Sequence, residues 1–221
     1  MRSHNTLLGT VLSASILVYS SNASAQSDDA GWYLKPTIAL SQLSDETGNT
    51  TGIGNSDGIA PVNLNSGFAS GLVLGYDYGS SWSAELGWEY RSNDSEVTLA
   101  DGTGFSDGNY ASNTFFINGI YKFDTDSQWQ PYLGAGLSFI QEIDIDLESN
   151  ATELSYSGDS ETGFQFFAGI EREIGGNWSI LGEARYTNFD ELELEGENTA
   201  GRFSNLGYSP VSLQLGLKYS F

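Results

Sequence analysis

The sequence contains no cysteine and a single histidine, and these two shortages exclude several kinds of chemistry. Without cysteine the chain has no disulfide framework, no thiol chemistry and no site for a lipid anchor. The one histidine is His4, close to the N-terminus. The rest of the chain therefore lacks the base of a Ser-His or Cys-His mechanism and lacks imidazole metal ligands. We predict a protein that is not an enzyme, with no catalytic residue, no cofactor and no bound metal.

Basic residues are also scarce: eight Lys and Arg stand against 29 Asp and Glu, which gives a formal net charge of −21. Such an excess of acid argues against nucleic acid as a partner, because phosphates require Lys and Arg. Acidic chains of this kind are often disordered. Here aromatic residues make up 13 % of the sequence, and apolar residues alternate regularly, so the chain has enough core material to fold.

Long apolar runs are limited to residues 7–19, which follow the basic start at Arg2. This run is shorter than the ~20 residues that a membrane-spanning helix needs. Ala23-Ser24-Ala25 then offers the small-x-small pattern of a cleavage site. We predict a cleaved secretory signal at 1–25, in preference to a retained anchor helix, and one domain at 26–221.

Period-2 alternation is the main pattern in the remaining sequence and predicts strands. Eight segments carry it, each near or above the ~9–11 residues that a tilted strand needs to cross a membrane. They lie at 32–41, 67–78, 82–91, 113–123, 131–142, 162–173, 178–188 and 210–221. Because no second apolar run could form a helix, any membrane span must be built from strands.

The connections between these segments alternate in length. Three are tight turns rich in Gly, Ser, Asn and Asp, at 79–81, 124–130 and 174–177. The other four are long, at 43–66, 92–112, 143–161 and 189–209. Short periplasmic turns and long outer loops are typical of transmembrane barrels. We predict an all-β fold: an eight-stranded antiparallel up-and-down transmembrane β-barrel with short periplasmic turns and long extracellular loops.

Alternation alone does not identify the solvent, so a soluble β-sandwich or a lipocalin-like barrel is the competing fold. Two features favour lipid. The outward face is almost purely apolar in several strands, and aromatic residues gather at strand ends, as in an interfacial girdle. These aromatic residues are Trp32, Trp82, Trp129, Trp178, Tyr90, Tyr121, Phe123, Tyr219 and Phe221.

Three stretches resemble a known family. Gly31-Trp32-Tyr33-Leu34-Lys35 and the run from Trp129 to Gly136 are similar to the OmpA-like or OmpX-like small barrels of the outer membrane. The alternating C-terminal strand, which ends on Tyr219 and Phe221, resembles the assembly signal of such barrels. The resemblance implies location in the cell outer membrane, contact with its lipid and lipopolysaccharide, and recognition by the barrel assembly machinery.

Strand parity predicts which charged residues face the barrel lumen. Outward Trp82, Leu86 and Trp88 leave Glu85 and Glu89 inside. The same reasoning gives an almost neutral lumen set of Lys35, Asp77, Glu85, Glu89, Lys122, Glu171, Glu183, Arg185 and Lys218. A barrel of eight strands is only wide enough for its own side chains, and buried charges must be paired. A salt-bridged plug is the plainer interpretation, and a narrow conductive path is the alternative.

Two of the long connections repeat an acidic-aliphatic alternation. The acids are Glu142, Asp144, Asp146, Glu148, Glu191, Glu193 and Glu195. We interpret them as the continuation of two strands beyond the membrane, and continued parity predicts that the acids face the barrel axis and the aliphatic residues face outward. Such an acidic rim could serve adhesion, weak Ca²⁺ binding or cation focusing, or it could simply keep the surface solvated.

Taken together, these patterns predict a monomeric, non-enzymatic outer-membrane barrel with a structural or surface-interaction role, such as adhesion to a host or cell-surface ligand. One alternative is a small pore for ions or hydrophobic molecules. The other is an acidic, Ca²⁺-responsive surface binding module.

Overall fold

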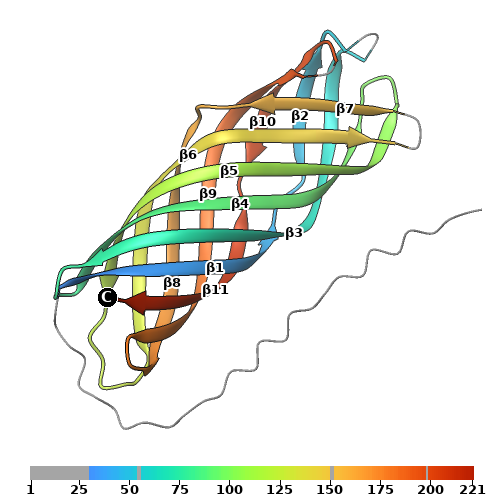
Figure 1. The fold of residues 1–221 in the computed structure, drawn as a ribbon. Helices are drawn as coiled ribbons and strands as arrows, with labels where there is room; N and C mark the ends of the chain where they lie inside the picture. Colours follow the sequence, from blue (N-terminus) through green and yellow to red (C-terminus); the bar gives the residue numbers. More distant parts are fainter. Residues whose placement is uncertain (1–29, 54–55, 150–151, 198) are drawn as a thin grey trace, which may run out of the picture.

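The computed structural model describes residues 30–221 except 54–55, 150–151 and 198. The predicted signal at 1–25, including His4, lies outside the described residues. Strands account for most of the described chain, and Figure 1 shows them winding into one elongated barrel. Their bounds are β1 Gly31–Gln42, β2 Glu46–Thr51, β3 Gly58–Asp77, β4 Trp82–Thr98, β5 Gly104–Lys122, β6 Gln130–Glu148, β7 Glu153–Gly158, β8 Thr162–Gly175, β9 Trp178–Gly196, β10 Arg202–Tyr208 and β11 Val211–Ser220.

Eight of these strands form a closed antiparallel ring. The hydrogen-bonded order is β1-β3-β4-β5-β6-β8-β9-β11, and β11 pairs with β1 to close the circle. Each ring strand corresponds to one of the eight segments predicted from alternation, so the predicted barrel is confirmed. The tight turns at 79–81, 124–130 and 174–177 all lie at the end of the barrel where β1 begins and β11 ends (Figure 1).

The prediction of four long loops is wrong in one respect, because most residues of these connections form strands. β3, β4, β5, β6 and β9 extend well beyond the predicted segments. The short strands β2, β7 and β10 continue β1, β8 and β11 beyond an irregular break, and they pair with the extended strands. The result is a second ring stacked on the first. We call it the extracellular extension, because it is formed by the connections predicted as extracellular loops.

The outer wall of the first ring is an apolar band. Its strands expose large apolar side chains such as Ile38, Leu72, Leu86, Ile117 and Leu215. Aromatic rings collect at the short-turn end, in edge-to-face or tilted pairs that include Trp32 with Tyr76, Trp82 with Tyr121, and Trp178 with Tyr219. An apolar band with amphipathic aromatic side chains at its edge fits a bilayer and its interface.

Glycines on the lumen face make room for large inward rings. A Cβ built on Gly75 would lie 2.1 Å from the Tyr33 ring, and one on Gly134 would lie 2.1 Å from the Phe167 ring. A Cβ built on Gly169 would lie 2.3 Å from the Tyr132 ring. Large side chains from one strand therefore fill the space left by glycine on its neighbour, and the lumen is densely packed.

Candidate functional site: lumen and extracellular extension

The lumen of the membrane band holds a charged network. All nine residues predicted to face the lumen do so; Asp77 is partly exposed and the other eight are buried. Strand alternation brings them together from seven strands, because each inward position of one strand lies beside an inward position of the next. Eight of these nine residues form ion pairs with one another, as buried charges must.

The central part of the network contains two ion pairs supported by tyrosines. Lys35 on β1 pairs with Glu85 on β4, and the Tyr33 hydroxyl donates to the same carboxylate at 2.9 Å. Arg185 pairs with Glu183 at 2.7 Å, and the Tyr132 hydroxyl donates to Glu183 at 2.9 Å. Each carboxylate is therefore held by an ion pair and a second donor, which is the arrangement that a buried charge requires.

Two further pairs lie toward the short-turn end. Lys122 pairs with Asp77, and Lys218 pairs with Glu171 at 2.8 Å. The Lys218 ammonium also lies 4.5 Å from the centre of the Tyr33 ring. The periplasmic mouth is thus crossed by ion pairs rather than left as an open polar funnel.

Arg91 was missing from the predicted set. It pairs with Glu89 at 2.5 Å and donates to the Ser41 hydroxyl at 2.6 Å. Gln214 donates to the other oxygen of Glu89 at 2.9 Å. The parity that places Glu89 inside also places Arg91 inside, so the signal was present in the sequence. With Arg91 the network comprises five ion pairs and its formal charges balance.

Above the charged network, the extension is filled by an apolar core. Twenty buried residues form one continuous cluster, which we call the apolar plug. Its fully buried members include Ile143, Ile145 and Leu147 on β6 and Leu192 and Leu194 on β9. The prediction that these aliphatic residues face outward and the acids face the axis is therefore wrong.

Two β-bulges explain the reversal. On β6, Glu142 lies opposite Asn113 and Ile140 lies opposite Thr114, so Gln141 is an extra residue. On β9, the register with β10 shifts near Glu191, which has a φ of 42°. One extra residue moves all later side chains to the other face of the strand. Parity carried through from the membrane band therefore gives the wrong face beyond each bulge.

The predicted acidic residues lie on the outside of the extension, and we call them the acidic collar. Asp144 and Asp146 are half-buried on the wall, and the Asn109 amide donates to Asp146 at 3.2 Å. Burial, reinforced by the charges of Asp146 and Glu142, raises the pKa of Asp144 to about 6. The full collar is Glu142, Asp144, Asp146, Glu148, Glu191, Glu193 and Glu195.

Most basic side chains lie in the lumen, whereas the outer surface of the extension carries mainly acidic ones. Of the basic residues that the structure describes, only Arg172 and Arg202 are outside the lumen network. Arg172 lies at the periplasmic rim, and Arg202 opens β10 near the tip. Among the described residues, no group of three or more His, Cys, Asp or Glu side chains could hold a metal ion. The outer surface of the extension is therefore acidic, almost without compensating cations.

A closed ring of tilted strands, a lipid-type apolar wall and a paired polar lumen define a transmembrane β-barrel. In the part of the chain that the structure covers, no helix is long and apolar enough to cross a membrane. Comparison with known families agrees: the profile described as "Outer membrane protein beta-barrel domain" matches residues 11–221. The chain belongs to this family, and it is an outer-membrane protein.

Individual relatives support the same assignment. The protein named "Protein opa" of Haemophilus influenzae is 30 % identical over 91 residues, which are 40 % of this chain and 72 % of that protein. Among solved structures, OprG of Pseudomonas aeruginosa gives a TM-score of 0.65 at 16 % identity, over 86 % of this chain and 96 % of OprG. Neisserial surface protein A gives 0.52 at 17 % identity, over 87 % of this chain and 99 % of its own. These two likenesses show the fold.

Proposed function

We propose that this chain is a non-enzymatic surface protein whose closed barrel holds an acidic extension outside the cell, where it meets a positively charged host or cell-surface ligand. The observation that carries the proposal is the packing of the interior. Five ion pairs fill the lumen within the membrane, and the apolar plug fills the extension above them. What remains available to a partner is the outer surface of the extension.

The outer surface has a definite electrostatic character. The acidic collar lies on the outer faces of β6 and β9. Asp94 and Glu96, which are exposed on β4, add to the same acidic surface. Arg202 is the one basic residue on the outside of the described extension. A surface of one sign attracts an oppositely charged partner over a Debye length and steers its approach. Complementary charge therefore favours a basic protein or peptide as the ligand class.

Binding of a lysine-rich peptide to the purified barrel in detergent micelles would test this function. Neutralising part of the collar, with Asp146→Asn, Glu193→Gln and Glu195→Gln in one variant, is expected to weaken binding roughly tenfold at low salt. The effect should shrink at high salt, because exposed charges are screened.

The matched control removes three acids at the other end of the barrel, with Asp124→Asn, Asp126→Asn and Glu173→Gln. Both variants change the net charge equally, so only the position of the charges differs. The control is expected to bind as the wild type does. Equal weakening in the two variants would show that net charge alone governs binding, and the proposal would fail.

Other functions receive less support. For the barrel to act as a small pore, a solute would have to pass both the ion pairs and the apolar plug. A Ca²⁺-responsive module would need a ligand cluster, and the described part of the collar offers none of three or more side chains in reach of one ion. The non-enzymatic part of the proposal rests on the lack of cysteine and of any histidine other than His4.

A further inference from the structure

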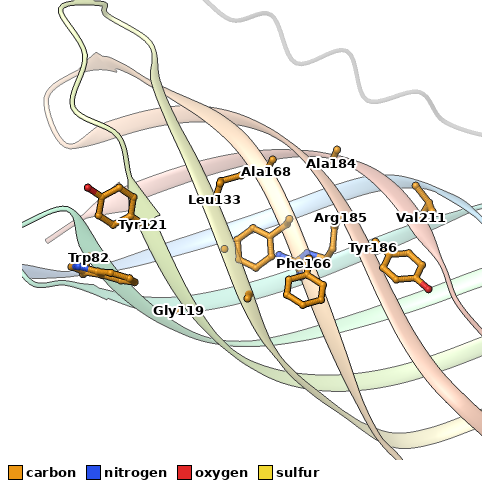
Figure 2. A pocket seen from close by; sticks show the side chains of 13 residues that line it. Trp82, Gly119, Tyr121, Leu133, Phe166, Ala168, Ala184, Arg185, Tyr186 and Val211 are labelled. Carbon is orange, nitrogen blue, oxygen red and sulfur yellow. The ribbon is translucent and has the colours of Figure 1, made fainter.

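A groove of about 640 Å³ crosses the outer wall of the barrel within the apolar band. Most of its lining residues come from β5, β6, β8 and β9, and Figure 2 shows the large side chains of Leu133, Phe166 and Tyr186 among them. Small outward residues form its floor. These are Gly119, Ala135, Ala168 and Ala184.

Strand register explains why the small residues make one groove. Gly119 lies opposite Ala135, and Ala168 lies opposite Ala184. Leu133 lies opposite Ala168 and Phe166 lies opposite Ala135, so these two large side chains flank the diagonal along which the small pairs meet. The two small pairs therefore lower the surface along a diagonal line across the four strands, while the larger neighbours remain at the usual height.

The groove continues an interface that is already established, because the wall around it faces lipid. Phe166 is 57 % exposed and Leu133 is 52 % exposed, both within the apolar band. In a bilayer the occupant of such a groove is a hydrocarbon chain. Apolar surface alone gives no preference over bulk lipid, so retention must come from close packing and from a contact with the head group.

Arg172 supplies that contact. It is the one basic side chain on the outside of the described membrane band, and it lies four residues after Ala168 on β8. Its guanidinium lies 5.4 Å from the centre of the Trp129 ring and donates to Gln128 at 2.8 Å. The cation is thus positioned at the aromatic rim on the strand that forms the groove floor, at the level where phosphates of the periplasmic leaflet lie.

From the groove and the cation together we infer a specific phospholipid site. One acyl chain lies in the groove over Ala168 and Ala135, and the phosphate of the same lipid pairs with Arg172. The ligand is a membrane phospholipid of the periplasmic leaflet. This site is independent of the surface partner proposed for the extension. It lies in the periplasmic leaflet, whereas the extension lies beyond the membrane on the other side.

Native mass spectrometry can count the lipid that stays on the barrel after purification in a mild detergent. The barrel is equilibrated with equal amounts of phosphatidylglycerol and a diacylglycerol of the same chains. We expect the wild type to retain phosphatidylglycerol preferentially, by roughly threefold, which is the range of a partly exposed ion pair. Arg172→Gln should bring the preference close to one.

Filling the groove tests the chain-binding part. Ala168→Leu, and independently Ala135→Leu, should lower the retention of both lipids severalfold while the barrel still resists SDS before heating. Ser70→Leu on β3 and Arg202→Gln at the tip are the matched controls, and both should behave as the wild type. Retention unchanged by both leucine variants, a lipid preference unchanged by Arg172→Gln, or equal effects in the controls would overturn the inference.

Discussion

Arg185 shows how single residues stabilise the lumen. Its guanidinium lies between the rings of Phe116 and Phe167, 4.8 Å from the centre of each, and its charge is balanced by Glu183. The site is apolar on two sides, so the carboxylate is the partner that makes a buried cation acceptable.

Removing that partner should be costly. Glu183→Gln removes the carboxylate that forms the ion pair with Arg185, and we expect the free energy of unfolding to fall by about 3 kcal/mol. Urea unfolding of the barrel in lipid vesicles measures the change. Glu173→Gln, at the exposed periplasmic end, should change it by less than about 0.5 kcal/mol. Similar values for the two variants would contradict the importance of the lumen pairs.

Asp144 gives a pH-dependent prediction. Its folded-state pKa of about 6 lies above the ordinary value, so the folded state binds the proton more tightly than the unfolded state. Its contribution to stability is therefore present at low pH and is lost as the pH rises through about 6. Asp144→Asn should stabilise the protein by about 1 kcal/mol at pH 7.5, after allowance for solvent screening.

The advantage of Asp144→Asn should shrink toward pH 4.5, where the wild-type carboxyl is largely protonated. Urea unfolding of both proteins at the two pH values gives the comparison, and other carboxyl groups cancel in the difference. An advantage that grows as the pH falls would have the wrong sign for this account.

At the scale of elements, the β-bulge at Gln141 sets which face of β6 is buried in the extension. Deleting Gln141 alone would remove the bulge and restore regular pairing with β5, and Glu142 would stay outward with Ile143 inward. Deleting Gln141 and Glu142 together would remove one residue more than the bulge and turn the later aliphatic residues of β6 outward. In both variants we expect the membrane ring to form and still resist SDS, but only the double deletion should make the extension sensitive to protease. An extension that stays resistant in the double deletion, or becomes sensitive in the single deletion, would mean that the residue count at the bulge does not decide the facing.

The last strand makes a separate prediction about assembly. Phe221 is 73 % exposed, its amide donates to Trp32 at 3.0 Å, and its ring packs edge-to-face on Tyr219. Since the ring buries little surface, Phe221→Ala should hardly change stability of the refolded barrel. If the ring is read during assembly, the variant should instead reach the outer membrane in cells at a severalfold lower level. If the variant reaches the outer membrane at the normal level, Phe221 is not part of the assembly signal.

The elements also show what the sequence could and could not predict. Ring strands such as β4 and β11 have an unbroken period of two, so their number, order and lumen residues followed from alternation. β2, β7 and β10 were missed because they are short and rich in Gly, Ser and Asn. The facing of the collar failed at Gln141 and Glu191, where one bulge residue reverses parity without a distinctive local signal.

At the scale of the whole molecule, three layers follow one another along the barrel axis. A periplasmic rim of aromatic rings leads to a lumen of paired charges, and the apolar plug fills the extension beyond it. Polar groups are thus concentrated inside where lipid surrounds the wall, and outside where water does. The acidic extension is in effect a second, water-soluble barrel section built on the membrane ring.

The central claim is that this barrel is closed and presents its outer surface to a partner. Conductance of the wild-type protein in planar lipid bilayers tests it most directly. We predict no discrete conductance steps, because both the ion pairs and the apolar plug obstruct the axis. Regular steps that change with Lys122→Ala or Glu85→Ala would contradict the account and establish a pore through the charged lumen.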